Sequence, residues 1–191
     1  MHLPKRLFHY TVGIKLKNIQ ADGYLKTTPT ESKLGERPLV WLSSNPYYEQ
    51  TARKHFMKPG ISDNQLGTLL EMDDYGNGVY RFSFLTDNLP EHLTPLPWHT
   101  LKHQSRMRKN LIDRLVKRAK GVKAKPREWY GVMDRIPVQL ATLERLHTDS
   151  GQWVEISLSS AADEPSKHNV QQMLDNEVPN HLRSRDEQWK E

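Results

Sequence analysis

Segments with the spacing of β-strands occur throughout residues 7–158, and segments with helical spacing lie between them. Alternating or continuous apolar runs predict strands over residues 7–11, 39–43, 69–72, 79–85, 129–136, 140–147 and 153–158. Apolar residues three and four apart predict helices over residues 12–21 and 106–120, and the helix-start signal of Asn45 and Pro46 predicts a third over residues 47–55. Because strands and helices do not alternate one for one, the parallel sheet of an α/β protein is disfavoured. We expect an α+β fold of small, split antiparallel sheets with helices inserted between the strands.

Turn and cap residues mark where several of these elements begin and end. Thr11 is placed to cap the first helix, and Gly23 is placed to end it in the left-handed conformation. Asn45 followed by Pro46 is typical of a helix start. An Asn-Gly pair within residues 74–78 predicts the turn of a hairpin. These signals agree with the boundaries that the apolar spacing predicts.

The length and composition predict one domain with a polar tail. A chain of 191 residues can bury one sizeable core. Its hydrophobic fraction of 36% and mean hydropathy of -0.79 are low for this length, so part of the chain is expected outside the core. Residues 160–191 contain four basic and seven acidic residues, a net charge of -3. We predict a single α+β domain over residues 1–158 and an acidic, poorly ordered tail over residues 159–191.

The cysteine content and the apolar segments indicate a cytoplasmic protein. With no cysteine, disulfides and thiolate metal sites are excluded, and a reducing compartment is expected. Residues 1–6 lack the apolar run of a signal peptide, and no stretch approaches the roughly 20 apolar residues of a membrane helix. The nine histidines are scattered, and His99 and His103 have no glutamate between them. We therefore expect no membrane partner and no metal.

Polar side chains gather at the ends of the first two predicted strands. They are His9, Tyr10 and Thr11 in the first strand and Ser43, Ser44 and Asn45 in the second. Strand ends with hydroxyl, imidazole and phenol groups are places where ligand sites are built, because a rigid scaffold holds the donors and acceptors. We expect a binding site where these two strand ends meet.

Three motifs follow one another in the chain: LFHYT at residues 7–11, VWLSSNP at residues 40–46 and WVEI at residues 153–156. In this order, with a helix that ends in glycine after the first, they resemble the ADP-ribosyltransferase fold superfamily. More closely, the chain resembles a group of small, uncharacterised bacterial and phage proteins with the motifs YHYT, VWFS and a PLPW-like segment. The resemblance spans residues 7–158 and implies an ADP-ribosyltransferase-like α+β fold.

The resemblance implies NAD as a substrate and assigns roles to individual residues. His9 would contact the ribose of NAD and take part in catalysis, and Ser43 and Ser44 would supply hydroxyls from the second strand. Glu155 would be catalytic, because a carboxylate beside the ribose stabilises the oxocarbenium-like state formed when the nicotinamide bond breaks. The rest of the expected NAD-binding set is Tyr10, Thr11 and Asn45.

Each role has an alternative that the residues leave open. Glu155 also fits a surface glutamate on a half-exposed strand, and Glu49 is the other candidate carboxylate. His9 also fits a histidine bonded to a backbone carbonyl. Many transferases that modify proteins carry Gln or Glu two residues before the catalytic Glu, where this chain has Trp153. A helix start at Asn45 is most simply a cap, and it would also offer N–H groups to a pyrophosphate.

Residues 102–127 carry a strong positive charge. They contain eleven Lys or Arg residues and one acidic residue, a net charge of +10. The helix predicted over residues 106–120 would attract nucleic acid or another polyanion. The candidate contacts are Arg106, Arg108, Lys109, Arg114, Lys117 and Arg118. No aromatic residue is interleaved within residues 102–125, which argues against sequence-specific recognition of single strands.

Two classes of function therefore remain open. The first is an ADP-ribosyltransferase that uses NAD and modifies protein or nucleic acid. The second is a non-catalytic protein that binds nucleic acid or an acidic host protein through residues 102–127. A cleft in which His9, Ser43 and Glu155 converge favours the first class, and a basic face with those three residues apart favours the second. A solvated helix face, paired with the acidic tail, is the structural alternative for the basic segment.

Overall fold

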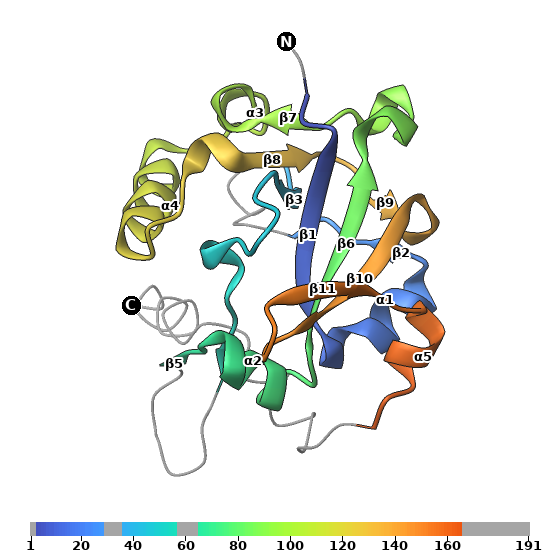
Figure 1. Ribbon diagram of the computed structural model, residues 1–191. Helices are drawn as coiled ribbons and strands as arrows, with labels where there is room; N and C mark the ends of the chain where they lie inside the picture. Colours follow the sequence, from blue (N-terminus) through green and yellow to red (C-terminus); the bar gives the residue numbers. More distant parts are fainter. Residues whose placement is uncertain (1–2, 29–35, 57–64, 166–191) are drawn as a thin grey trace, which may run out of the picture.

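A central antiparallel sheet organises the part of the chain that the structure describes. The structure is a computed structural model that describes residues 3–28, 36–56 and 65–165 (Figure 1). Seven strands form the sheet in the order β11-β10-β6-β1-β3-β8-β7, and every neighbouring pair is antiparallel. These strands are β1 (Arg6–Val12), β3 (Val40–Ser43), β6 (Val79–Leu85), β7 (Leu96–Pro97), β8 (Trp129–Val132), β10 (Ala141–His147) and β11 (Gln152–Glu155).

Five α-helices and two short strand pairs accompany this sheet in the described residues. The helices are α1 (Leu16–Asp22), α2 (Leu69–Tyr75), α3 (Trp98–Gln104), α4 (Lys109–Gly121) and α5 (Leu158–Ala162). The strand pairs are β2 (Tyr24–Leu25) with β9 (Ile136–Pro137) and β4 (His55–Phe56) with β5 (Gln65–Leu66). An antiparallel sheet with helices in this irregular order confirms the α+β class. Within the described ranges, no helix is long and apolar enough to cross a membrane.

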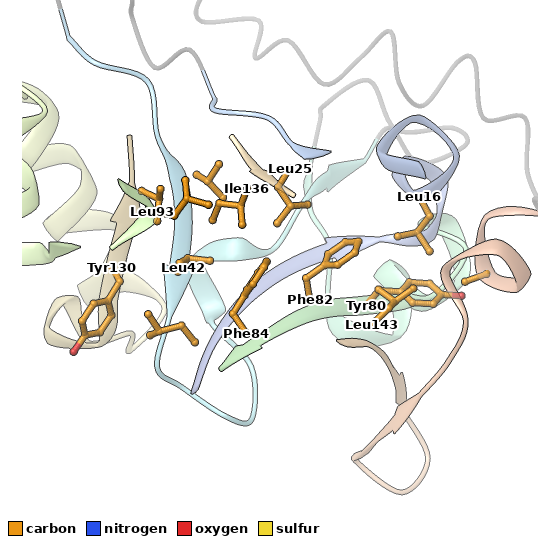
Figure 2. Close-up of a cluster of buried hydrophobic side chains, with 14 residues drawn as sticks. Leu16, Leu25, Leu42, Tyr80, Phe82, Phe84, Leu93, Tyr130, Ile136 and Leu143 are labelled. Atoms are coloured by element: carbon orange, nitrogen blue, oxygen red, sulfur yellow. The ribbon is translucent and has the colours of Figure 1, made fainter. Parts of the chain in front are cut away.

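The larger hydrophobic cluster lies on one face of the sheet. Tyr80, Phe82 and Phe84 alternate along β6 and point into this cluster (Figure 2). Leu16 of α1 and Ala161 of α5 are buried against the same cluster. Since these two helices cover this side, we call it the α1/α5 face.

The opposite side of the sheet is the α2/α4 face. Tyr10 of β1 packs there in one cluster with Met72 of α2. Leu111 of α4 packs in a third cluster, to which Trp41 of β3 contributes. Arg81 of β6 also lies on this face, since the pairing places it beside Tyr10, and alternation along the strand turns it away from the aromatic residues of β6.

The prediction of a β-hairpin with its turn at residues 74–78 is wrong. The segment before this turn, predicted as a strand, begins helix α2 instead. Thr68 and Glu71 form a capping box, in which each side chain accepts a hydrogen bond from the backbone N–H of the other. The strand after the turn, β6, pairs with β1 and β10.

The first two predicted helices are also shorter than expected. β1 continues to Val12, so Thr11 is a buried strand residue and does not cap a helix. Helix α1 ends, as predicted, at Gly23, whose φ is 71°. The helix predicted over residues 47–55 is reduced to the 3-10 helix η3 (Gln50–Ala52).

Two helices, α3 and α4, contain many of the basic residues of residues 102–127, and a residue with a left-handed backbone conformation lies between them. Arg106, between α3 and α4, has a φ of 59°, which no α-helix can accommodate. The N–H of Arg108 donates to Oε1 of the buried Glu36 at 3.2 Å, and α4 begins at the next residue, Lys109. The helix predicted over residues 106–120 therefore starts at Lys109 and runs to Gly121.

The folded chain extends beyond residue 158, where the domain was predicted to end. Helix α5 follows β11, and Glu164 after it pairs with Arg145 of β10 at 3.0 Å. The carboxylate of Glu164 also accepts from the hydroxyl of Tyr80 at 3.1 Å. These contacts hold the start of the predicted tail against the sheet. The remainder of that tail, residues 166–191, lies outside the described residues.

Candidate functional site

The two polar strand ends meet, but their side chains lie on opposite faces of the sheet. β1 and β3 pair at Phe8 and Ser43. Alternation then places Ser43 and Tyr10 on the α2/α4 face, and His9 and Thr11 on the α1/α5 face. The predicted NAD-binding set is therefore divided between the two faces.

His9 is bonded to the backbone of the neighbouring strand. Its Nδ1 lies 2.9 Å from the carbonyl oxygen of Trp41. Since a carbonyl only accepts, Nδ1 carries the hydrogen and Nε2 carries none in the neutral ring. Burial lowers the pKa of His9 from 6.5 to about 4, so the imidazole is neutral at physiological pH. This contact corresponds to the structural alternative for His9, a histidine that bonds a backbone carbonyl.

The end of β3 forms a hydrogen-bonded corner around a buried carboxylate. Ser43 Oγ donates to Glu49 Oε2 at 3.1 Å and accepts from the N–H of Asn45 at 3.1 Å. The other oxygen of Glu49 accepts from the N–H and from Oγ1 of Thr51, at 3.1 and 2.7 Å. Glu49 is only 5% exposed, and these hydrogen bonds compensate its burial. The structure therefore brings Glu49, rather than Glu155, to Ser43.

Asn45 makes a turn and does not start a helix. Its Oδ1 accepts from the N–H of Tyr47 at 3.0 Å, and its carbonyl accepts from the hydroxyl of Tyr10. The N–H of Ser44 donates to the carbonyl of Glu128 at 2.8 Å, which ties the corner to the start of β8. Because the chain is not helical immediately after Asn45, this corner presents no helix N-terminus to a pyrophosphate.

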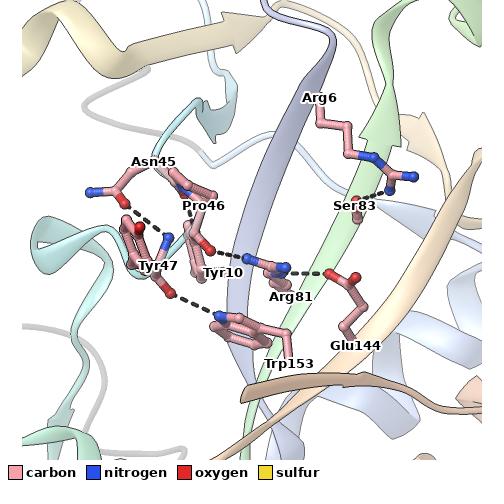
Figure 3. Close-up of polar contacts among 9 residues, drawn as sticks. All are labelled: Arg6, Tyr10, Asn45, Pro46, Tyr47, Arg81, Ser83, Glu144 and Trp153. Carbon is pink, nitrogen blue, oxygen red and sulfur yellow. Dashed lines mark hydrogen bonds and ion pairs between the residues drawn. The ribbon is translucent and has the colours of Figure 1, made fainter. Parts of the chain in front are cut away.

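Arg81 lies on the α2/α4 face between Pro46 and Glu144 (Figure 3), and sequence analysis did not identify it as a site residue. It is 7% exposed, and its Nε lies 2.5 Å from Oε2 of Glu144. Its Nη1 donates to the carbonyl of Pro46. The guanidinium lies over the rings of Phe8 and Trp153, 4.2 and 4.3 Å from their centroids. We call these five residues the Arg81 clamp.

Trp153 connects the last strand of the sheet to the corner after β3. Its Nε1 donates to the carbonyl of Tyr47 at 2.9 Å, and its ring lies 5.8 Å from that of Tyr10. The position two residues before Glu155 therefore belongs to the Arg81 clamp. Since the charged groups of the clamp are paired with each other, the arrangement favours a structural role, which is to fix the corner on the sheet.

Glu155 lies apart from the other residues that the resemblance grouped with it. It is exposed on β11, directly opposite Glu144 of β10. It shares the α2/α4 face with Ser43, but β10, β6 and β1 lie between their strands. His9 lies on the other face of the sheet. The structure therefore does not bring His9, Ser43 and Glu155 together.

Helix α4 and the turn before it present most of their basic residues to solvent. The helix buries Leu111 and Ala119 and leaves its opposite side exposed. The exposed cations of this region are Arg106, Arg108, Lys109, Arg114, Lys117, Arg118 and Lys120, and we call all of these except Arg118 the basic surface. Arg118, also predicted as a contact, donates from Nη2 to the carbonyl of Arg53 at 3.3 Å. That bond anchors α4 to the segment that follows the corner, so we leave Arg118 out of the basic surface.

Comparison with known proteins gave no match, whether to models of protein families, to the curated proteins or to the solved structures. Within the described ranges, no group of three or more His, Asp or Glu residues could hold a metal ion.

Proposed function

We propose that this protein binds nucleic acid through the basic surface, without reading the base sequence. The observation that carries the proposal is the gathering of six exposed cations on one helix and the turn before it, with Asp113 as the acidic residue of that helix. Such a concentration of one sign of charge creates a field that attracts polyanions.

The dimensions of α4 suit contact with a phosphate backbone. The helix has 13 residues, so it is about 20 Å long. Double-stranded DNA carries one negative charge per about 1.7 Å of its axis, so several phosphates fit along such a length. Neutralising phosphates releases condensed counterions, which supplies binding free energy whatever the base sequence. Lys117 and Lys120 are flexible and exposed, and they can follow phosphates of either strand.

The arrangement of the sheet gives less support to catalysis. A converging His9, Ser43 and Glu155 would favour transfer of ADP-ribose from NAD, and these residues lie apart. The polar groups of the corner at Ser43 and of the Arg81 clamp form hydrogen bonds and ion pairs with other groups of the protein. The transferase and its ADP-ribosyltransferase-like fold remain expectations that rest on the motif resemblance, and a binding protein is the function that the geometry supports better.

The proposal is tested by fluorescence anisotropy with a labelled duplex of mixed sequence at about 0.1 M salt. The test variant is the triple Lys109→Gln/Lys117→Gln/Lys120→Gln, which removes three positive charges from α4. The matched control is Lys5→Gln/Lys17→Gln/Lys26→Gln, which removes the same charge from exposed positions elsewhere.

We expect the test variant to lose affinity by up to two or three orders of magnitude, since each phosphate contact is worth about eightfold at this salt concentration. The control variant should bind within a few-fold of the wild type. Equal losses of affinity in both variants would mean that binding depends on the net charge of the protein and not on the basic surface. If the wild-type protein does not bind the duplex, the proposal is refuted.

A further inference from the structure

A polar hollow opens on the side of the sheet where β1 begins and β6 ends. Its volume is about 240 Å³. Its walls come from β1, β6 and β10, from the 3-10 helix η4 (Thr86–Asn88) after β6, and from the 3-10 helix η7 (Val138–Leu140) before β10. The lining residues with polar side chains are Arg6, Ser83, Asn88, Gln139 and Thr142. Neither the basic surface nor the predicted NAD-binding set contributes to this lining.

Two of these polar groups lie side by side and have hydrogen-bonding capacity left. Nη1 of Arg6 donates to Ser83 Oγ at 3.0 Å (Figure 3). A guanidinium has five N–H donors, so most donors of Arg6 remain available, and within the described residues no carboxylate pairs with it. Ser83 is 3% exposed, and among the described residues its hydroxyl has this one hydrogen bond, in which it accepts. The hydroxyl proton of Ser83 is therefore free to be donated into the hollow.

Arg6 is the one charged residue among those that line the hollow. None of its lining residues is acidic. Glu144 follows Thr142 on the same face of β10, but its carboxylate is paired with Arg81. A buried hydroxyl without an acceptor is costly, and an arginine without a counterion attracts anions.

We propose that this hollow binds a small molecule through a carboxylate or phosphate group, held by Arg6 and by the hydroxyl of Ser83. Arginine presents its N–H groups in a fork that matches two oxygens of such an anion. The amides of Asn88 and Gln139 and the hydroxyl of Thr142 would contact polar substituents of the same molecule. The volume lies below the usual range for drug-sized ligands, which indicates a small metabolite-sized ligand.

The test is an NMR titration of the full chain, labelled with ¹⁵N, with inorganic phosphate and separately with acetate. For at least one anion we expect saturable shifts of the backbone amides of Ser83 and Thr142. Arg6→Gln should weaken that binding by about tenfold or more, because it removes a charge-assisted hydrogen bond. Ser83→Ala should weaken it a few-fold.

Lys5→Gln is the matched control, because it removes the same charge from the neighbouring exposed residue that does not line the hollow. This variant should bind within about twofold of the wild type. An equal loss in Lys5→Gln and Arg6→Gln would overturn the proposal, as would shifts that do not saturate with either anion. The basic surface is unchanged in Arg6→Gln, so a normal duplex affinity in this variant separates the two proposals.

Discussion

Protonation of His9 should destabilise the folded protein as the pH falls. The folded-state pKa is lowered from 6.5 to about 4 by burial of the ring, so between these values the unfolded chain binds more protons than the folded one. The stabilising effect of a neutral His9 is therefore complete above about pH 6.5 and is lost progressively down to about pH 4. One pKa unit corresponds to about 1.4 kcal/mol, so the loss reaches about 3 kcal/mol. That is a large part of the 5–15 kcal/mol that stabilises a typical domain.

The assay is urea unfolding of the wild type and of His9→Asn at several pH values between 7.5 and 4. The asparagine amide can donate to the Trp41 carbonyl in place of Nδ1, but it does not titrate. The free energy of unfolding should therefore fall by about 3 kcal/mol more in the wild type than in the variant over this range. An NMR titration of the His9 ring measures its pKa directly. Parallel pH profiles, or a ring that titrates near its ordinary value, would refute the reasoning.

Two further predictions concern the stability of other parts of the chain. Glu144→Ala should lower the free energy of unfolding by about 2–4 kcal/mol, because it leaves the buried guanidinium of Arg81 without its counterion; urea unfolding measures this, and a loss below about 1 kcal/mol would argue against the Arg81 clamp. Lys123→Gly should raise the unfolding free energy by roughly 0.5–1 kcal/mol, because Lys123 has a φ of 57° that glycine adopts without strain. Thermal unfolding measures this, and a lower unfolding midpoint in the variant would contradict the left-handed conformation of Lys123.

Local patterns predicted those elements whose boundaries depend on neighbouring residues. The alternation in residues 79–85 placed Arg81 opposite the aromatic residues of β6, because side chains along a strand alternate whatever the partner strand is. Gly23 ended α1 as predicted, since a left-handed C-terminal position is a local requirement. The capping box of Thr68 and Glu71 was also present in the sequence. This pattern marks the start of α2, although the apolar run after it is also compatible with a strand.

The parts that sequence analysis missed depend on contacts between distant residues. Asn45 has the sequence signal of a helix start, but its carbonyl is bonded by Tyr10, 35 positions away in the chain. Arg81 and Glu144 are 63 positions apart, and the pairing of β6 with β10 brings them together. The division of His9 and Ser43 between two faces follows from the register of β1 and β3. A single sequence does not specify any of these pairings.

The salt dependence of duplex binding tests the proposed function most directly. For wild type and for Lys109→Gln/Lys117→Gln/Lys120→Gln, the logarithm of the association constant is measured against the logarithm of the salt concentration. Each phosphate contact contributes about 0.9 to the slope, so the triple variant should have a slope smaller by about 2.7. Lys5→Gln/Lys17→Gln/Lys26→Gln should keep the slope of the wild type. A wild-type slope in the α4 variant would mean that these lysines do not contact phosphates, and it would contradict the assignment of the basic surface.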